Sequence, residues 1–274
     1  CEEITLECNP DDLSENYVRQ LRSLPINRLS IGIQSFNDNE LTFINRRHSA
    51  TQAIEAVKRC QENGFSNISI DLIFGLPFQT LESFESNLNK TLKLDVQHVS
   101  IYGLTFEEGT KIEQQRQKKL FTETDEETTI LMYQMAIEKL TSNGFEHYEI
   151  SNFAKPKMHS KHNSSYWNGT HYLGIGSGAH SYNGTSRQWN ICDTKKYCSL
   201  HNYFETEKLS ISDIYNELII TNLRKKKGID LRFIEQTFEE KFYNHCKKMA
   251  QNFVDNNLLE EKNNHLKKTQ KGIL

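Results

Sequence analysis

Long hydrophobic runs are missing from this chain of 274 residues. Apolar stretches such as Leu72–Phe74 and Leu218–Ile220 fall far short of the ~20 residues that a membrane-spanning helix needs. Proline and glycine are also scarce, with 4 and 13 residues, which argues against a disordered or collagen-like chain. No secretory signal opens the sequence. We therefore expect a soluble, cytoplasmic protein without an integral membrane span.

The sequence also lacks cysteines at the spacing typical of metal-binding motifs. None of the six cysteines forms a C-x2-C pair or a C-x3-C-x2-C loop, so no iron–sulfur motif is present. Without a secretory signal, the cysteines are best explained as reduced thiols. They stand at positions 1, 8, 60, 192, 198 and 246.

Charge of one sign does not dominate either, because the net charge is −3. Residues 218–274 nevertheless contain 12 Lys and Arg against 7 Asp and Glu, a local charge of +5 that leaves −8 for residues 1–217. A solvated lysine-rich end explains this asymmetry most simply. A nucleic-acid-binding winged helix is a minor alternative, but the basic run Arg224–Lys227 has no interleaved aromatic residues and stops at Gly228. We expect no nucleic-acid partner.

Strand and helix signals alternate through the first half of the chain, and 15 Phe and 11 Tyr are enough to build a core. Strands are expected at 3–7, 28–33, 68–74 and 99–104, with a shorter one at 147–150. Helices are expected at 14–24, at 50–63, after the cap Thr80, and from the capping box Thr124–Glu127 to Gly144. Near-continuous apolar strands alternating with helices are typical of a parallel sheet covered by helices. Without a dinucleotide fingerprint, a partial (βα) barrel is favoured over a doubly wound sheet.

The pattern changes beyond about residue 155. Residues 159–190 are rich in Gly, Asn, His and aromatic residues, a loop-like and site-like composition. Helices follow at 215–224, 231–237 and 239–256, and a small hairpin is expected between 258 and 272. We therefore predict a partial barrel over 1–155, a connecting segment over 156–210 and a winged-helix-like module over 211–274.

Polar side chains stand at the carboxyl ends of three predicted strands, where ligands bind in parallel barrels. Glu7, Gln34 and Asp71 each follow an apolar strand. Two carboxylates and an amide at one mouth can accept hydrogen bonds from an amine and from ribose hydroxyls. Arg46 adds a guanidinium fork for a carboxylate.

Two further motifs lie in the connecting segment. The glycine spacing in Gly174–Ala179 resembles that of a phosphate-binding loop, but no helix pattern follows it. A close approach of its backbone to another ligand is therefore favoured. His162-Asn-x-x-Tyr166-Trp167 combines a neutral imidazole, an iron ligand, with flat aromatic faces that suit a tetrapyrrole. A buried aromatic cluster with a satisfied histidine is the structural alternative.

These motifs together resemble a known family. Glu7–Pro10, Gly32–Phe36, Asn45-Arg46 and Ile70–Pro77 are similar to the later barrel motifs of radical S-adenosylmethionine (SAM) proteins, and more narrowly to the oxygen-independent coproporphyrinogen III oxidase group. Within that group, His162–Trp167 and Gly174–Ser181 resemble the branch of the haem chaperones, HemW. The resemblance covers nearly the whole chain.

The resemblance implies a fold and a set of ligand contacts. The implied fold is α/β: a partial parallel (βα) barrel of the radical SAM type with its later strands only, followed by a small, mainly helical, winged-helix-like C-terminal domain. The implied SAM contacts are Glu7, Gln34, Arg46 and Asp71, with Tyr102 and Thr105 lining the same site. The candidate haem-related residues are His162, Tyr166 and Trp167.

The resemblance also implies a 4Fe-4S cluster whose ligands this chain lacks. We expect the family's cysteine loop, its glycine-rich SAM motif and the first two βα units to lie upstream of Cys1. The thiol of Cys8 does not replace them, because one thiolate is not a cluster site. The chain therefore contains no metal site of its own by the family's motif.

The leading hypothesis is a protein that binds haem and delivers it to recipient haemoproteins, with SAM bound in the barrel. The alternative is an oxygen-independent coproporphyrinogen III oxidase of porphyrin biosynthesis, in which the cofactor supplies the radical and the barrel orients the porphyrinogen. A homodimer is one oligomeric state consistent with either hypothesis.

Overall fold

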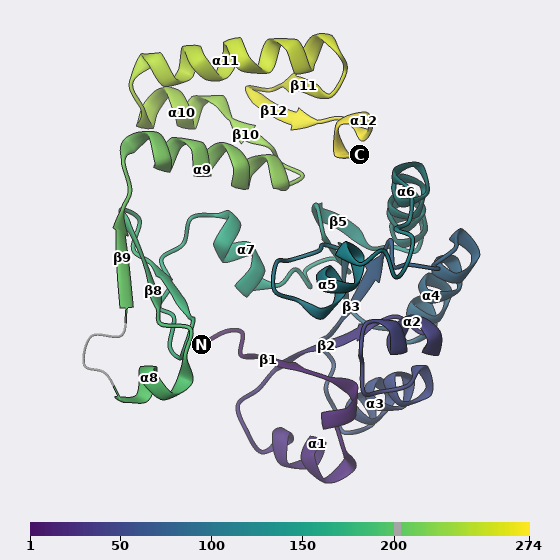
Figure 1. Cartoon of the computed structure of the whole chain (residues 1–274). Coiled ribbons are helices and arrows are strands. Elements are labelled where there is room, and N and C mark those ends of the chain that lie inside the picture. Colours follow the sequence, from purple (N-terminus) through teal and green to yellow (C-terminus); the bar gives the residue numbers. More distant parts are fainter. Residues whose placement is uncertain (200–203) are drawn as a thin grey trace. The chain divides into compact units, whose positions relative to one another are not determined.

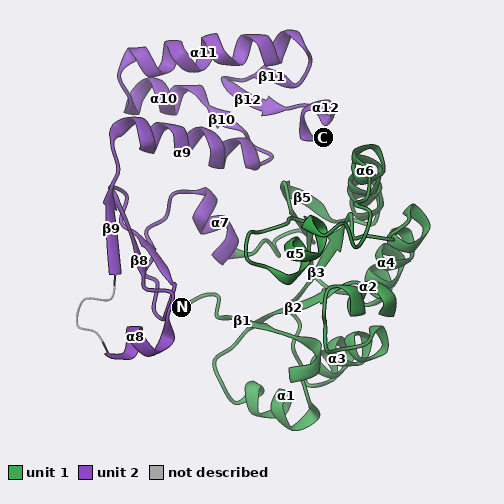
Figure 2. Ribbon diagram, in the orientation of Figure 1, with its two compact units in different colours: residues 1–160, 274 green, residues 161–273 purple. Residues whose placement is uncertain are grey.

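The computed structural model describes residues 1–199 and 204–274, which form two compact units (Figures 1 and 2). Unit 1 comprises residues 1–160 and 274, and unit 2 comprises residues 161–273. The three-part division at 155 and 210 stays a prediction about domain organisation.

Unit 1 is built on one six-stranded sheet in the order β1-β2-β3-β4-β6-β5 (Figure 1). Its strands are β1 (Thr5–Cys8), β2 (Arg28–Gln34), β3 (Ile68–Phe74), β4 (His98–Gly103), β5 (Glu146–Glu149) and β6 (Asn152–Ala154). The first four are parallel, as predicted. The strand expected at 147–150 is present as β5, but it forms a hairpin with β6, which pairs antiparallel with β4. A two-residue connection permits only antiparallel pairing, so the series of parallel units stops at four.

Helices cross between the parallel strands. They are η1 (Pro10–Asp12), α1 (Glu15–Arg22), α2 (Asp38–Phe43), α3 (Ala50–Glu62), α4 (Leu81–Lys93), α5 (Lys111–Gln117) and α6 (Glu126–Ser142). The predicted caps Ser14 and Thr80 are confirmed, because each side chain accepts a hydrogen bond from a backbone N–H of the first turn. The predicted capping box at Thr124 is wrong. Asp125 caps α6 through the Thr128 N–H, while the Thr124 hydroxyl donates to the carbonyl of Leu76.

The core of unit 1 lies between the sheet and these helices. Ile31, Ile70 and Val99 from three neighbouring strands are fully buried, and Phe84 of α4 packs beneath them without exposure. A sheet covered in this way explains why its strands read as almost continuous apolar runs.

Strand β1 forms one edge of this sheet and pairs only with β2 among the described residues. An unpaired strand edge can pair with a strand of another chain. We therefore expect the 274-residue chain to self-associate as its concentration rises, and Thr5→Lys, which places a charge on the edge, to weaken that association. Sedimentation velocity over a concentration series measures it. A monodisperse monomer at every concentration would contradict this prediction.

Unit 2 contains a three-stranded sheet and a helical module (Figure 2). The segment expected to be loop-like instead contains α7 (Lys161–Trp167), β7 (His180–Tyr182) and β8 (Ser186–Asn190), followed by α8 (Thr194–Ser199) and β9 (Phe204–Lys208). The three strands pair antiparallel in the order β7-β8-β9. This correction arises because Gly and aromatic residues mark the short turns and faces of a small sheet as readily as a loop.

The C-terminal module of unit 2 has the element order of a winged helix. It comprises α9 (Ile211–Arg224), β10 (Ile229–Asp230), α10 (Leu231–Thr237), α11 (Glu240–Asp255), β11 (Leu259–Lys262), β12 (His265–Lys268) and α12 (Gln270–Ile273). Its core gathers Tyr215, Ile234, Phe242 and Leu266. The predicted hairpin is confirmed at β11 and β12, but Lys271 and Gly272 lie in α12 rather than in the hairpin.

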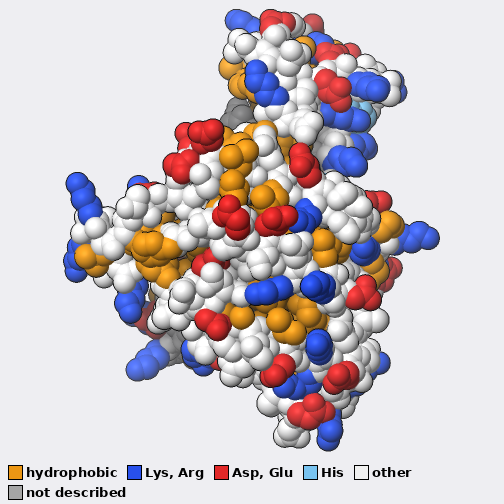
Figure 3. Space-filling view, turned by 90° about the vertical axis from the view of Figure 1, so that its right-hand side faces the viewer, with side chains coloured by type: hydrophobic (Ala, Val, Ile, Leu, Met, Phe, Trp, Pro, Cys, Tyr) orange, Lys and Arg blue, Asp and Glu red, His pale blue; other side chains and the backbone are white. Residues whose placement is uncertain are grey.

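The surface mixes charges. On the face drawn in Figure 3, side chains of both signs are interspersed and hydrophobic side chains form separate patches. In residues 1–199 and 204–274, no helix has both the length and the apolar character needed to cross a bilayer. All six cysteines are free thiols, as expected.

Candidate functional site

Asp71 is the central residue of β3 and lies beside Ser100 of β4 in the sheet. Its pKa is raised to about 6, mainly by burial and less by the neighbouring Glu7, while a hydrogen bond from the Ser100 hydroxyl opposes the rise. A carboxyl that is largely desolvated and ionises near neutrality is typical of a ligand site.

Three other predicted contacts surround Asp71 within electrostatic reach. Glu7 comes from β1, Arg46 from the segment after α2, and Tyr102 from the end of β4. Burial raises the pKa of the Tyr102 phenol, with Asp71 as the next cause, although 42% of the side chain remains exposed. The structure therefore brings these three side chains within electrostatic reach of Asp71, and the role of all four as a ligand site, called the mouth below, stays a prediction.

Gln34 ends β2 beside Leu72 of β3, so it lies next to Asp71 in the sheet. It is 8% exposed and has a φ of 70°, a backbone conformation that non-glycine residues seldom adopt. Its amide folds back so far that a Cβ on Gly32 would lie 2.8 Å from Nε2. Gly32 is therefore required for this placement, and a strained backbone at a strand end is a further mark of a functional position.

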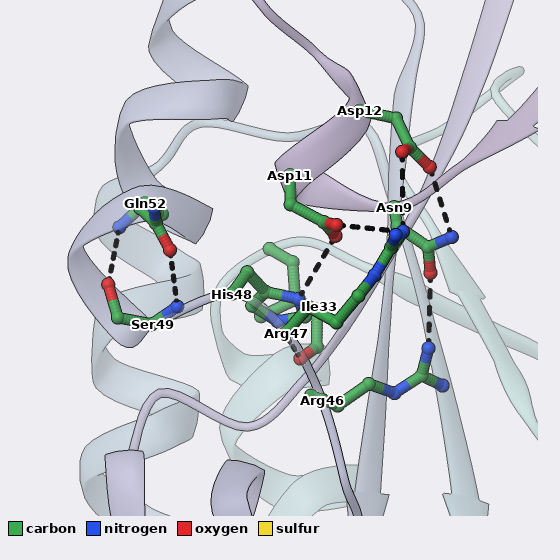
Figure 4. Close-up of polar contacts among 9 residues, drawn as sticks. All are labelled: Asn9, Asp11, Asp12, Ile33, Arg46, Arg47, His48, Ser49 and Gln52. Atoms are coloured by element: carbon green, nitrogen blue, oxygen red, sulfur yellow. Dashed lines mark hydrogen bonds and ion pairs between the residues drawn. The ribbon is translucent and has the colours of Figure 1, made fainter.

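Asn9 is a site residue that the sequence analysis missed. Figure 4 shows its amide between Arg46 and Asp12, where Oδ1 accepts a hydrogen bond from Arg46 Nη1 (3.1 Å) and Nδ2 donates to Asp12 (3.3 Å). Burial lowers the pKa of the Arg46 guanidinium, and Asp71 opposes that effect. Asn9 thereby orients one edge of Arg46 with a neutral acceptor and leaves its charge for a ligand. The signal available in the sequence was the Asn-Pro pair directly after β1.

The residues after Arg46 fasten the same segment to η1. Arg47 pairs with Asp11 at 2.8 Å and Asp12 at 3.3 Å, and the buried His48 ring contacts the Ile33 carbonyl at 3.0 Å (Figure 4). Burial lowers the pKa of His48, so its ring is held neutral. These contacts position Arg46 without touching the mouth themselves.

A cavity of about 550 Å³ adjoins the mouth. It is lined by Arg46, by Ile73 and Leu104 at the ends of β3 and β4, and by Ile112 of α5. The lining is mixed, because polar or charged groups lie beside these apolar side chains, namely those of Thr42, Asn45, Thr110, Lys111 and Gln115. A guanidinium beside a partly apolar surface suits a ligand with a carboxylate and a ring. The remaining predicted contact, Thr105, is exposed after β4, and its role in the site stays a prediction.

A cluster site is not present in the part of the chain that the structure describes. No three His, Cys, Asp or Glu side chains there are grouped so that they could hold a metal ion. Burial also raises the pKa of the Cys8 thiol to about 12, which keeps it protonated and unsuited to ligation. The residues present therefore do not fit an iron–sulfur cluster.

The second candidate group lies on α7 in unit 2. His162 and Tyr166 are one helical turn apart, and their rings meet edge to face at 5.0 Å. Trp167 faces a different side of the helix and lies against Arg224 of α9, whose guanidinium is 4.4 Å from the ring centre. The motif therefore does not present three side chains to one point.

Tyr166 and Trp167, but not His162, line a cavity of about 470 Å³ within unit 2. Its other walls come from the β7-β8 sheet and from α9 and α10. Trp167 Nε1 is buried there and has no hydrogen-bond partner among the described residues. Tyrosine and tryptophan rings around an open space are the chemistry that binds a flat apolar ligand.

The glycine-rich segment closes on its own chain. A Cβ on Gly174 would lie 2.1 Å from the carbonyl oxygen of His180 in β7, so only glycine allows this approach. Asn190 donates to the carbonyl of Gly176 at 2.8 Å. The close approach is thus made to β7 of the same chain, whereas the sequence analysis favoured an approach to a ligand, which stays a prediction. The glycine-rich segment leads into β7 and not into a helix.

Two family models match this chain and assign it radical SAM and HemN C-terminal domains. The model of the radical SAM superfamily matches residues 2–90, and the model of the HemN C-terminal domain matches residues 209–274. Coproporphyrinogen III oxidase (HemN) from Escherichia coli, a radical SAM enzyme, superimposes with a TM-score of 0.83 at 23% identity, over 99% of this chain and 67% of that one. The expected α/β fold with a parallel sheet and a helical C-terminal region is confirmed.

Curated relatives make the assignment narrower. The haem chaperone HemW of Bacillus subtilis is 38% identical over 88% of this chain, and that of Lactococcus lactis is 34% identical over 99%. The chain belongs to the HemW family. It spans 64% and 73% of the lengths of these two relatives.

Proposed function

We propose that this chain binds haem and passes it to recipient haemoproteins, with SAM bound at the barrel mouth. The observation that carries the proposal is the α7 group, His162, Tyr166 and Trp167, in a chain of the HemW family. A cytoplasmic location accords with its free thiols. The oxidase alternative rests on a likeness of fold at 23% identity, and nothing in the site favours it over haem binding.

The proposed SAM contacts include both acidic and basic side chains, which would bind different parts of the ligand. Asp71 and Glu7 would accept hydrogen bonds from the ligand's amine and ribose hydroxyls, while Arg46, oriented by Asn9, would hold its carboxylate. Gln34, next to Asp71, supplies an amide that both donates and accepts. In the cavity beside Arg46, the apolar side chains of Phe43, Ile73 and Ile112 would contact the adenine ring.

The haem contact is assigned to His162. Its imidazole lies on the exposed side of α7 and is braced by the edge of Tyr166, a position from which it can bind iron and also release it. A carrier needs such an accessible ligand, because a deeply buried one would retain the haem.

Titrating haem into the 274-residue chain tests this proposal. We expect a stoichiometric Soret shift that His162→Ala loses, with affinity reduced by about tenfold or more because the axial ligand is removed. His180→Ala, which removes an exposed imidazole of β7 away from the cavity, is the matched control and should bind as the unaltered chain does.

Transfer provides the second readout. Haem bound to the chain should pass to an apo-haemoprotein, followed by the change in its absorbance, and His162→Ala should slow that transfer. Equal binding and transfer by His162→Ala would refute the role of this residue. Protoporphyrinogen formation from coproporphyrinogen III under reducing, anaerobic conditions would favour the oxidase instead.

A further inference from the structure

The cavity of unit 2 has an unbalanced charge at one end. Two ammonium groups, those of Lys225 and Lys227, line it just beyond the last turn of α9. Lys225 is half-buried, and its Nζ contacts the neutral Oδ1 of Asn168 at 3.1 Å. Neither lysine has a carboxylate partner among residues 1–199 and 204–274.

The acidic groups of the cavity are already engaged. Arg187 binds Glu217 through two contacts, Nε to Oε1 at 2.9 Å and Nη2 to Oε2 at 2.8 Å. Asp230 caps α10 by accepting from the Arg232 and Phe233 N–H groups, and it lies 3.5 Å from His265. In the part of the chain that the structure describes, neither acid forms an ion pair with Lys225 or Lys227, and the cavity lining as a whole contains three cationic side chains against these two carboxylates.

The two lysines also act on each other. Burial lowers the pKa of Lys225, and repulsion from the Lys227 ammonium is the second cause. A carboxylate placed between two such groups would relieve the repulsion and gain charge-assisted hydrogen bonds. The basic run is thus more than a charged helix end, because the half-buried Lys225 and the exposed Lys227 both line the cavity while Lys226 does not.

The rest of the cavity is mainly aromatic and aliphatic, with the polar side chains of Asn168, Thr221 and Asn222 among them. Rings of Tyr166, Trp167, Tyr182 and Phe233 line it together with the aliphatic side chains of Ile214 and Leu218. An inorganic anion or a nucleic-acid backbone would leave these apolar surfaces unused. A flat apolar ring that carries acid groups on one edge would contact both the aromatic side chains and the two lysines of this cavity.

We propose that this cavity is the binding site for the carboxylate edge of a tetrapyrrole, with Lys225 and Lys227 holding its acid groups and Trp167 and Tyr166 contacting its ring. The assignment rests on the proposed haem-binding function, and it adds a site that selects the ligand by its carboxylates. His162, which lies outside the cavity lining, then serves the iron and not the acid groups.

Comparing haem with haem dimethyl ester tests the assignment, because the ester keeps the ring and the iron but lacks the negative charges. We expect the unaltered chain to bind haem about tenfold more tightly than the ester. The double variant Lys225→Met/Lys227→Met should bind both ligands with the affinity that the unaltered chain has for the ester. Lys226→Met, which removes the same charge one position away from the cavity lining, should keep the preference.

A fluorescence readout places the ligand. In a Trp189→Phe background, Trp167 is the remaining tryptophan, and haem bound in the cavity should quench its emission in parallel with the Soret shift. Quenching without any preference for haem over the ester would overturn the carboxylate site while leaving haem binding intact.

The other outcomes are equally decisive. A double variant that keeps the preference would overturn the assignment. No binding of either ligand by the unaltered chain would overturn both this assignment and the proposed function. Salt-dependent binding of duplex DNA that the double variant loses, without discrimination between haem and ester, would assign the lysines to phosphate instead.

Discussion

Replacing Asp71 with asparagine is expected to stabilise the chain at pH 7 by about 2 kcal/mol and to leave its stability nearly unchanged at pH 4. Burial holds the pKa of this carboxyl at about 6 in the folded chain, whereas an unfolded aspartate has a pKa of about 3.9. The folded state must therefore keep an ionised carboxylate in a poorly solvated place above pH 6. Asparagine keeps the shape and still accepts from the Ser100 hydroxyl, but it carries no charge.

The sign follows from proton binding. Because the folded pKa is the higher one, the folded chain binds more protons than the unfolded chain between about pH 4 and 6. The contribution of Asp71 to stability is thus complete below pH 4 and is lost as the pH rises through 6. Two pH units correspond to about 3 kcal/mol, and partial access of solvent at the mouth reduces this to about 2.

Thermal unfolding of the two chains at pH 4 and pH 7, followed by circular dichroism, measures the difference. Glu62→Gln, an exposed carboxylate in the same unit, is the matched control and should show no pH-dependent gain. If Asp71→Asn raised the free energy of unfolding equally at both pH values, the ionised carboxylate of Asp71 would not be what destabilises the folded chain at pH 7. If Asp71 is retained for a ligand, the same substitution should weaken SAM binding at pH 7 while raising stability.

The barrel was predictable because its signals are local. Strand β3 lies at the residues expected from its apolar run. Asp71 was expected at the end of that strand but lies at its centre, beside Ser100 of β4. The position of Arg46 was expected, but not what orients it. Asn9 lies 37 residues away in the sequence, and only the fold brings the two together.

Unit 2 shows the opposite case. The lysine run after α9 is indistinguishable in the sequence from a solvated helix end. What its side chains contact depends on residues far away in the chain, such as Asn168, which lies 57 residues before its partner Lys225. Likewise, β5 was predicted as a strand, but its direction depends on the short connection to β6. Whether a segment forms a helix or a strand depends mainly on local sequence. The direction of a strand in its sheet and the partners of a side chain depend on the tertiary structure.

Glu40→Ala is expected to destabilise unit 1 by about 1–3 kcal/mol, because it removes the shared acceptor of a buried network. Glu40 is 4% exposed on α2. Its carboxylate accepts from Ser35 Oγ at 2.5 Å, Gln79 Nε2 at 2.9 Å and Ser83 Oγ at 2.9 Å, and from Asn87 Nδ2 at 3.4 Å. Alanine would remove this acceptor from all four donors and leave Gln79, Ser83 and Asn87 with one other acceptor each.

The network joins the segments that carry the candidate site. Ser35 directly follows Gln34, and the Gln79 amide also donates to the Ile73 carbonyl at the end of β3, so one carboxylate ties the turns after β2 and β3 to α4. Loss of Glu40 should therefore loosen the mouth as well as lower the free energy of unfolding. Sequence patterns gave no indication of this, since a glutamate on a short helix is ordinarily solvated.

Urea unfolding followed by far-UV circular dichroism measures the loss, with hydrogen exchange of the Phe36 amide, which donates to Asn87, as a local readout. Tryptophan fluorescence does not report on this site, because Trp167 and Trp189 both belong to unit 2. Glu55→Ala on the exposed side of α3 is the matched control and should change stability by no more than about 0.5 kcal/mol. A Glu40→Ala chain as stable as this control, with the Phe36 amide still protected, would show that the network does not hold the mouth together.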